Sequence, residues 1–360
     1  MGKTKCIMLI VTYKCNLNCV YCYEPKKLAH RMTIDTARDI IMSQMASLDS
    51  EYDKIEIQFM GGEPLIEYNL IKELSEWLWT QDWGQCELVL FASTNGTLLD
   101  DEMKEWFSKN KDRIVLGLSF DGNAFMQNVN RSHSSNCVDV DFFSNTWPNQ
   151  SIKMTVSPYT VPSLSEGVIY LHGKGVKYII ADLATGNKVK WTVDSLEVYS
   201  CQLNKLIDFY LNNPNISPLS LLNLDIYSVA RRQGVRKSCS CGEDLTCFDW
   251  DGKPYACHLF SPVAMPKEQA IRAHEEIDFH NYNLFMSPKC NNCVLGELCN
   301  SCPGMNYICS GDVSQPSLFH CRAFKIEFVA NCKFKLHRAY MSGDDAIINR
   351  ISRIVNNIKL

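Results

Sequence analysis

The sequence predicts an α/β fold, a partial (β/α)6 TIM-like barrel followed by a small cysteine-rich metal-cluster domain and a C-terminal helix. Two observations support this prediction. Short apolar runs alternate with helix-period stretches over the first half of the chain, which favours parallel strands joined by helices. Ten cysteines then fall between Cys239 and Cys321, in a segment poor in core residues that needs metal to hold its shape.

We expect three parts along the chain. Residues 1–235 form the partial barrel with bridging helices, residues 236–325 the cysteine-rich domain, and residues 326–360 a C-terminal helical segment. A closed barrel of eight units typically takes about 250 residues. Six units end here near Leu183, so we expect a barrel that is open on one side.

Six strands are expected, each a short apolar or alternating run. Ile55, Ile57 and Phe59, for example, alternate with polar residues. The expected strands span residues 5–12, 55–60, 87–94, 114–120, 151–156 and 176–183. The sequence motifs discussed below follow the first four of these strands, at the end where such folds place their active sites.

Helices are expected between the strands. Thr33 can cap a helix with apolar positions near a 3.6-residue period, and Ser163 with Glu166 has capping-box spacing for a helix that ends near Lys174. Further helices are expected at residues 69–80, after Asp100, at 194–212, at 219–233 and from 322 onward. Residues 123–150 carry no pattern that assigns them.

Composition and charge exclude several classes of protein. The 360 residues are 46% hydrophobic, and a net charge of -4 argues against a nucleic-acid groove. No apolar stretch reaches the roughly 18 residues that a membrane span needs, and no signal peptide is present. We therefore expect a cytoplasmic protein, in which 18 cysteines are better explained by metal than by disulfides.

Three thiols, Cys15, Cys19 and Cys22, fall within eight residues directly after the first expected strand. A loop this short can turn three thiolates toward one point, which suits three of the four irons of a cubic iron-sulfur cluster. The fourth iron would then be open to a substrate or cofactor. The plainer alternative is a surface loop with free or zinc-bound cysteines.

The pattern CxxxCxxC, with Tyr21 before its last cysteine, resembles the signature loop of radical S-adenosylmethionine (SAM) enzymes. Met60-Gly61-Gly62-Glu63-Pro64 and Ser119-Phe120-Asp121-Gly122 resemble two further motifs of that family. The resemblance implies that S-adenosylmethionine binds the open iron of a [4Fe-4S] cluster. One electron then splits it into methionine and a 5'-deoxyadenosyl radical, which takes a hydrogen atom from the substrate.

The resemblance also implies a set of cofactor-binding residues. Gly61 and Gly62 let the backbone approach the methionine part, and Glu63 adds a carboxylate. Arg131 would pair with the methionine carboxylate as a bidentate fork. The remaining residues serve the ribose, methionine or adenine: Tyr21, Ser93, Asn95, Ser119, Asp121 and the backbone near Leu183.

The later cysteines resemble SPASM, a C-terminal domain with two auxiliary clusters that is found in radical SAM enzymes that modify peptides and proteins. By position, one [4Fe-4S] cluster would take Cys241, Cys247, Cys257 and Cys302. The other would take Cys290, Cys293, Cys299 and Cys321, which gives three clusters in all.

This cysteine pattern departs from the family at one place. Only two residues separate Cys299 from Cys302, where the family usually has three, so Cys309 is an alternative to Cys302. Cys239 likewise competes with Cys241. Two CxxC pairs can also make a tetrahedral zinc site, which remains open as an alternative.

His258 directly follows Cys257, where sulfatase-maturing relatives carry an aspartate thought to act as a base. A histidine can accept a proton near neutral pH, which makes His258 the candidate catalytic base. The alternative is a histidine that is only hydrogen-bonded near a cluster.

We therefore expect an enzyme that makes an oxidative crosslink or an epimerised centre in a ribosomally made peptide. The alternatives are an anaerobic sulfatase maturase that forms formylglycine from Cys or Ser, and a metal-bound scaffold without catalysis. The expected partners are a peptide or protein substrate and a flavodoxin- or ferredoxin-type electron donor. Since the chain begins almost at its first strand, a separate leader-binding protein or direct recognition is also expected.

Overall fold

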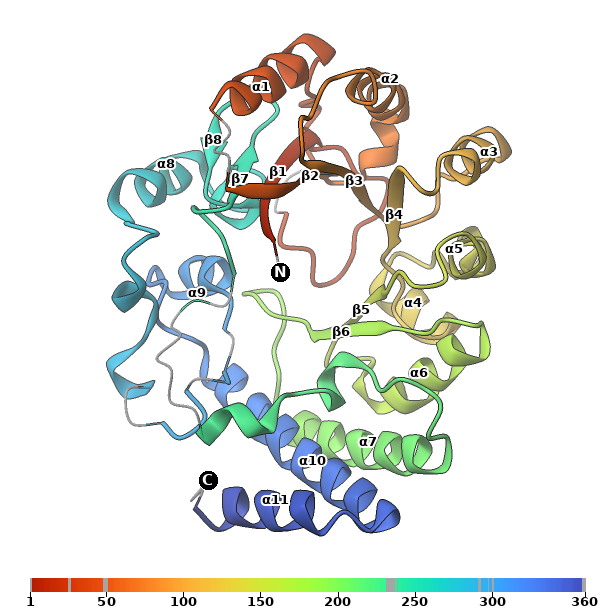
Figure 1. Ribbon diagram of the computed structural model, residues 1–360, viewed down its shortest axis with the longest axis vertical. Coiled ribbons are helices and arrows are strands. Elements are labelled where there is room, and N and C mark those ends of the chain that lie inside the picture. Colours follow the sequence, from red (N-terminus) through yellow and green to blue (C-terminus); the bar gives the residue numbers. More distant parts are fainter. Residues whose placement is uncertain are drawn as a thin grey trace. The chain divides into compact units, whose positions relative to one another are not determined.

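The computed structural model describes residues 2–24, 27–47, 51–230, 237, 239–290, 293–296, 298–299 and 301–357. They form two compact units, each built from segments that are distant in the sequence (Figure 1). The first unit comprises Met1–Ser119, Arg131–Gln150 and Ser240–His280, and the second comprises Phe120–Asn130, Ser151–Cys239 and Asn281–Leu360. The expected boundary at residues 235 and 236 lies outside the described residues, and the three-part division stays a prediction.

The first unit is organised around a six-stranded sheet in the order β4-β3-β2-β1-β7-β8. All neighbouring pairs are parallel except β7 with β8. The strands are β1 (Lys3–Thr12), β2 (Tyr52–Gly61), β3 (Glu87–Thr94), β4 (Ile114–Leu118), β7 (Leu245–Phe248) and β8 (Pro254–Tyr255). The expected, mostly parallel α/β fold is confirmed.

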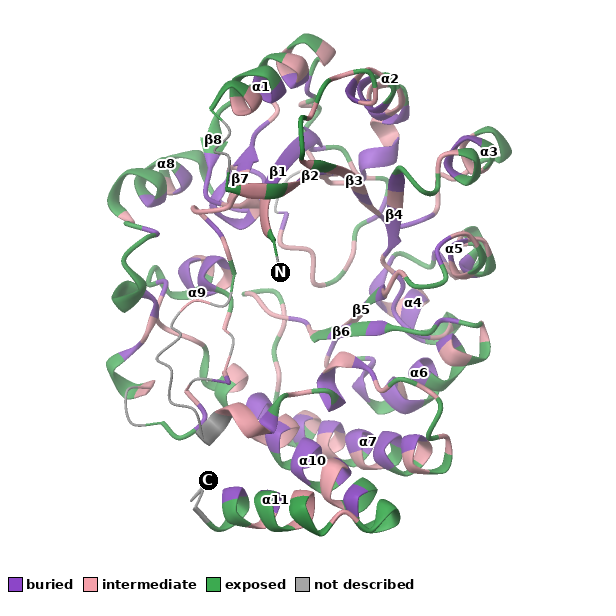
Figure 2. Cartoon of the chain, viewed as in Figure 1, coloured by how far each residue is buried: buried purple, intermediate pink, exposed green. Residues whose placement is uncertain are grey.

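Apolar burial explains why β1 and β2 lie at the centre of this sheet. From Cys6 to Val11, every residue of β1 is buried, which is typical of a parallel strand covered on both faces (Figure 2). In β2 the buried residues Ile55, Ile57 and Phe59 alternate with partly exposed ones, as the sequence predicted. Each fully buried side chain of this size contributes roughly 2 kcal/mol to folding.

The first three helices of the first unit, α1 to α3, follow its strands where the sequence predicted them, whereas α5 and α8 were not predicted. Thr33 Oγ1 accepts a hydrogen bond from Thr36 N at the start of the first helix, and Asp100 caps the third by accepting from Met103 N. The helices are α1 (Ile34–Ala46), α2 (Tyr68–Leu78), α3 (Asp101–Lys109), α5 (Val140–Thr146) and α8 (Lys267–Glu276).

The hairpin of β7 and β8 comes from the cysteine-rich region and extends the sheet beside β1. Cys6 to Leu9 pair in parallel with Leu245 to Phe248. The hairpin turns at Gly252, whose φ of 85° favours glycine. Part of the cysteine-rich region therefore shares a sheet with the strand that precedes Cys15.

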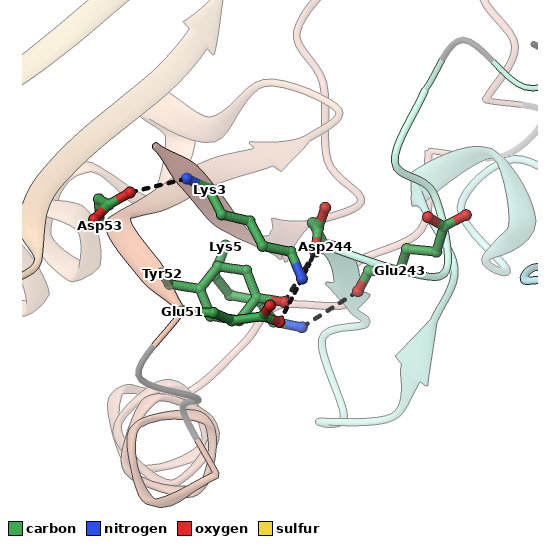
Figure 3. A network of polar contacts seen from close by, with 7 residues as sticks. All are labelled: Lys3, Lys5, Glu51, Tyr52, Asp53, Glu243 and Asp244. Atoms are coloured by element: carbon green, nitrogen blue, oxygen red, sulfur yellow. Dashed lines mark hydrogen bonds and ion pairs between the residues drawn. The ribbon is translucent and has the colours of Figure 1, made fainter. Parts of the chain in front are cut away.

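A polar network joins the amino ends of β1 and β2 to the turn before β7 (Figure 3). Lys3 pairs with Glu51 and, at 3.3 Å, with Asp244. Tyr52 donates its hydroxyl to Asp244 Oδ1 at 2.9 Å, and Lys5 Nζ donates to the backbone oxygen of Glu243 at 3.4 Å. Exposed ion pairs contribute little to stability, so the network mainly fixes the path of the chain into β7.

The second unit combines the parallel pair β5 (Ile152–Val156) and β6 (Ile179–Leu183) with helices. These are α4 (Ala124–Asn130), α6 (Leu164–Gly173), α7 (Val193–Asn212), α9 (Pro303–Ser310), α10 (Leu318–Ser342) and α11 (Asp345–Asn357). Gly343, with a φ of 68°, ends α10, so the expected single C-terminal helix is in fact two. Helix α11 is largely exposed in Figure 2 and buries Ile351 and Ile354 in an apolar cluster with Phe324 and Phe328.

Two helix predictions are wrong in detail. The described part of residues 219–233 forms only two short turns, Ser220–Leu222 and Ile226–Ala230. Buried Asn331 of α10 binds the backbone of this segment in place of a helical hydrogen bond. Its amide donates to Leu221 O at 2.8 Å and accepts from Leu224 N at 2.9 Å. The capping box at Ser163 is also absent, since Ser163 ends a preceding 3-10 turn and its side chain caps nothing.

In the part of the chain that the structure describes, no helix combines the length and the apolar character needed to cross a bilayer.

Candidate active site

The cysteine loop, residues 15–22, leaves the carboxyl end of β1 in the first unit. Cys22 N donates to Cys19 O at 3.1 Å, which closes a turn that carries two of the three thiols. Two residues before the loop, the hydroxyl of buried Tyr13 donates to the carboxylate of Asp249 at 2.7 Å. The base of the loop is thereby joined to the residue that follows β7.

The two glycines after β2 are needed because the cysteine loop lies directly against them. Gly62 N donates to Thr12 O at 3.0 Å, and Glu63 N donates to Lys14 O at 2.8 Å. A Cβ at Gly61 would come within 2.1 Å of Thr12 O, and one at Gly62 within 2.3 Å of Lys14 O and 2.9 Å of Cys15 Cβ. Only a residue without a side chain permits this approach.

Glu63 is buried, and its carboxylate binds groups of the protein. Oε1 accepts from Leu65 N at 3.1 Å and from Thr94 Oγ1 at 2.7 Å, while Oε2 accepts from Asn95 N at 2.7 Å. Burial raises the pKa of this carboxyl, and these hydrogen bonds oppose the rise. Glu63 therefore joins the ends of β2 and β3, and a direct contact with a cofactor stays a prediction.

Asn95 extends the same connection to the cysteine loop. Its Nδ2 donates to Asn16 Oδ1 at 2.9 Å, and Asn16 Nδ2 donates to Thr97 Oγ1 at 2.7 Å. Ser93 lies on β3 and is half-buried, and Ser119 N donates to Thr94 O at 2.9 Å. The predicted residues at the ends of β1, β2 and β3 thus meet in one place.

The segment that begins at Arg131 contacts another part of the loop. The Arg131 guanidinium lies 5.5 Å from the centre of the Tyr21 ring, and Asn18 N donates to Ser132 Oγ at 2.8 Å. Ser132 and His133 both adopt positive φ, at 53° and 56°, which is costly for residues other than glycine. Ser132 could not be predicted as a site residue, because nothing in the sequence indicates two consecutive left-handed residues.

Two predicted site residues, Asp121 and Leu183, belong to the second unit. Asp121 is completely buried, and its carboxylate accepts from Thr155 N at 2.9 Å and from Asn130 Nδ2 at 3.1 Å. Leu183 ends β6, and Ala184 N then donates to Val156 O. Asp121 thus helps to hold β5, and cofactor contacts by these two residues stay predictions.

The donor set of the cysteine loop fits an iron-sulfur cluster. Thiolates are the ligands of such clusters, and the Lys27 ammonium lies 3.3 Å from Cys22 Sγ. Among the described residues, no three His, Cys, Asp or Glu side chains are arranged to hold a single metal ion. A cubic cluster binds each thiolate at a different iron, so it needs thiols spaced around a larger volume.

The later cysteines fall into groups within each unit. Cys241 and Cys247 are buried in the first unit, where burial and the charge of Cys257 raise the pKa of Cys247. In the second unit, burial raises the pKa of Cys299 to about 12, and the charges of three more thiols contribute: Cys290, Cys321 and Cys293. These are the four thiols that the sequence predicted for one auxiliary cluster, and their binding of a cluster stays a prediction.

Two ligand choices are open, Cys239 against Cys241 and Cys302 against Cys309, and of these residues only Cys241 belongs to the first unit. Cys302 has a pKa raised by desolvation of its sulfur and by the charge of Cys239, although the residue as a whole is exposed. Cys239 is thus close enough to Cys302 to act on it, which keeps Cys239 as an alternative to Cys241. Cys309 is exposed on α9, and its place as a ligand stays open.

His258 lies beside the cysteine loop. Its ring is 5.3 Å from that of Tyr23, which directly follows Cys22. Burial raises the pKa of Tyr23, and the charges of Cys22, Glu24, Cys247 and Cys257 raise it further. The dipeptides Cys22-Tyr23 and Cys257-His258 therefore meet within the first unit.

Comparison with known proteins agrees with this geometry. The model of the radical SAM superfamily matches residues 9–138, which contain the cysteine loop, the two glycines and Arg131. The chain belongs to the radical SAM superfamily. An uncharacterized protein of Methanocaldococcus jannaschii, MJ0907, is 31% identical over 210 residues, covering 56% of this chain and 71% of that protein.

Another relative of this radical SAM enzyme is the cysteine-type anaerobic sulfatase-maturating enzyme of Clostridium perfringens. It is 23% identical over 324 residues, which cover 79% of this chain and 84% of the relative. Membership in the superfamily implies S-adenosylmethionine and a [4Fe-4S] cluster.

Solved structures share the fold. Native anSMEcpe with bound AdoMet and Cp18Cys peptide superposes with a TM-score of 0.69 at 19% identity, covering 98% of this chain and 100% of that one. Streptococcus suis SuiB bound to precursor peptide SuiA gives a TM-score of 0.59 at 14% identity, covering 89% and 76%.

Proposed function

We propose that this radical SAM enzyme modifies a ribosomally made peptide, by forming an oxidative crosslink or an epimerised centre. The observation that carries the proposal is the meeting of Cys22-Tyr23 with Cys257-His258. It brings a residue of the cysteine-rich region to the loop expected to cleave S-adenosylmethionine. The peptides bound in the solved anSMEcpe and SuiB structures also support a peptide substrate.

At the first site, Cys15, Cys19 and Cys22 would hold the [4Fe-4S] cluster. When bound, this cluster supplies the electron that splits S-adenosylmethionine, so that a 5'-deoxyadenosyl radical can take hydrogen from the peptide. Gly61 and Gly62, which let the backbone before the cysteine loop lie close to the end of β2, would face the methionine part, and Arg131 would offer a fork for its carboxylate. The Tyr21 ring beside Arg131 would line the cofactor.

Two auxiliary clusters would remove the second electron of the oxidation. One set of ligands is Cys290, Cys293, Cys299 and Cys321, and the other is Cys241, Cys247, Cys257 and Cys302. The charges of the other three thiols of the first set raise the pKa of Cys299, which supports the grouping of these four residues. Clusters fully ligated by protein leave no iron for substrate, which favours electron transfer over substrate binding.

His258 would accept the proton released in the oxidation. Its ring contact with Tyr23 places it next to the cysteine loop, and an imidazole can accept a proton near neutral pH. A His258→Gln variant should therefore still produce 5'-deoxyadenosine but lose modified peptide. An exposed residue of the same unit, His280, provides the matched control His280→Gln.

Sulfatase maturation is the second candidate function. The Clostridium perfringens maturase aligns along most of both chains, which favours formylglycine formation from Cys or Ser. A non-catalytic metal scaffold is the third candidate, and it predicts no cleavage of S-adenosylmethionine.

One experiment separates the three functions. The enzyme is produced anaerobically together with small peptides encoded beside its gene, and with a sulfatase peptide that contains Cys or Ser. A crosslink removes about 2 Da, whereas epimerisation leaves the mass unchanged and is found by chiral amino-acid analysis. Modification of the sulfatase peptide alone would replace the proposal with the second function.

A further inference from the structure

Lys27 connects the cysteine loop to a buried carboxylate. Its Nζ donates to Cys22 Sγ at 3.3 Å and to Glu24 Oε2 at 2.6 Å. Glu24 is only 4% exposed, and all three residues belong to the first unit. The ammonium therefore lies between a carboxylate and one sulfur of the loop.

Stability alone does not explain this pair. Burying a carboxylate is costly, and a buried ion pair is often no better for stability than an apolar pair of similar size. Glu24 Oε1 has no hydrogen-bond partner among the described residues, which adds to that cost. The sulfur of Cys22 is a second hydrogen-bond partner of the ammonium, and this contact gives the arrangement a use.

We propose that Lys27, held in place by Glu24, is a positioning residue that donates a hydrogen bond to the ligating sulfur of Cys22 and raises the reduction potential of the first cluster. This inference rests on the proposed function, in which Cys15, Cys19 and Cys22 hold that cluster.

The sign of the effect follows from charge. A low-potential donor of the flavodoxin or ferredoxin type, or dithionite in the test tube, gives the cluster one electron, and no bond forms or breaks in this step. The reduced state carries one more negative charge and is stabilised more by the nearby ammonium than the oxidised state is. Hydrogen bonds to cluster sulfurs are among the features that set such potentials. Removal of the ammonium should therefore make the cluster harder to reduce.

The test is a redox titration of the full-length, anaerobically reconstituted protein, monitored by electron paramagnetic resonance. The signal that changes when S-adenosylmethionine is added identifies the first cluster among the three. The variants are Lys27→Gln, Lys27→Arg and Glu24→Gln. Lys14→Gln is the matched control, because Lys14 is an exposed lysine directly before Cys15.

Lys27→Gln is expected to shift the midpoint of this signal to a more negative potential. Glu24→Gln removes the negative charge that offsets the ammonium and is expected to shift the midpoint to a more positive potential. Lys27→Arg, which keeps charge and donors, should stay nearer the wild type than Lys27→Gln, and Lys14→Gln should match the wild type. Equal midpoints for Lys27→Gln and wild type, or equal shifts in Lys27→Gln and Lys14→Gln, would overturn the inference. If Lys27→Gln fails to assemble, Glu24→Gln decides, and a wild-type midpoint there overturns it.

Failure of the proposed function gives a result that differs from failure of this inference. In that case the wild-type protein itself shows no signal that responds to S-adenosylmethionine, whatever the variants do.

Discussion

Glu63 Oε2 accepts the backbone N–H of Asn95 at 2.7 Å, so a buried carboxylate fastens the end of β2 to the end of β3. Asn95 Nδ2 in turn donates a hydrogen bond to Asn16 Oδ1 of the cysteine loop at 2.9 Å. The Gly-Gly-Glu-Pro motif therefore contributes in two ways, since its glycines make room for the loop and its carboxylate fixes the strand ends around it.

Glu63→Gln should destabilise the protein by about 2–4 kcal/mol. The amide replaces one acceptor oxygen by an N–H group that faces the donors of Asn95, Thr94 or Leu65. Thermal unfolding of the anaerobic protein measures the effect. Glu67→Gln is the matched control, because the Glu67 side chain caps no helix. Equal melting temperatures for the two variants would contradict the role of Glu63.

Gly62→Ala should displace the cysteine loop and lower the iron bound at the first site, since the new methyl group would lie 2.3 Å from Lys14 O. Iron analysis after anaerobic reconstitution checks this. Gly173→Ala is the control, because no atom lies within 4 Å of a Cβ at that position. A Gly62→Ala protein with wild-type iron content and spectrum would show that the close approach is unimportant.

The iron content of cysteine variants distinguishes the candidate ligands of the auxiliary clusters. Three [4Fe-4S] clusters correspond to about 12 iron atoms per chain. Cys302→Ala should lower this to about 8, while Cys309→Ala should leave it unchanged. The reverse result would assign the ligand to Cys309, and no loss in either variant would remove both from the cluster.

Glu327→Gln should change how stability depends on pH. Burial raises the pKa of Glu327 to about 7, the Tyr199 hydroxyl that donates to it at 2.9 Å opposes the rise, and the charge of Asp182 adds to it. The folded protein thus binds this proton more tightly than the unfolded chain, so stability is full below about pH 4.5 and falls as the pH rises to about 7. The loss is on the order of 3 kcal/mol.

The glutamine variant has no proton to lose and should lack this part of the pH dependence. Melting temperatures of the anaerobic protein between pH 5 and 8 measure the difference from wild type. Glu275→Gln, at an exposed position on α8, should follow the wild-type profile. Parallel profiles for Glu327→Gln and wild type would contradict the prediction.

Local patterns were enough to predict much of the fold. The strands from β1 to β6 and most of the helices follow from apolar periodicity and caps such as Thr33. The pairing of β7 with β1 could not be predicted, because two strands far apart in the sequence leave no local trace of their contact. The same holds for Asn331, which breaks an expected helix from a distant position on α10.

Those parts of the candidate site could be predicted in which the residue type alone indicates the chemistry. Three close cysteines and two adjacent glycines indicate a cluster loop and a close backbone approach. The contacts that hold them, from Ser132 to Asn18 and from Lys27 to Cys22, depend on side-chain positions that only the folded chain defines.

Cleavage of S-adenosylmethionine at the cysteine loop can be measured by incubating the dithionite-reduced, reconstituted enzyme with S-adenosylmethionine and quantifying 5'-deoxyadenosine and methionine. We expect both products in equal amounts from the wild type, and neither from a variant with alanine at Cys15, Cys19 and Cys22. An iron-loaded wild type that leaves S-adenosylmethionine intact, or a triple variant that still cleaves it, would show that the cysteine loop does not perform this reaction.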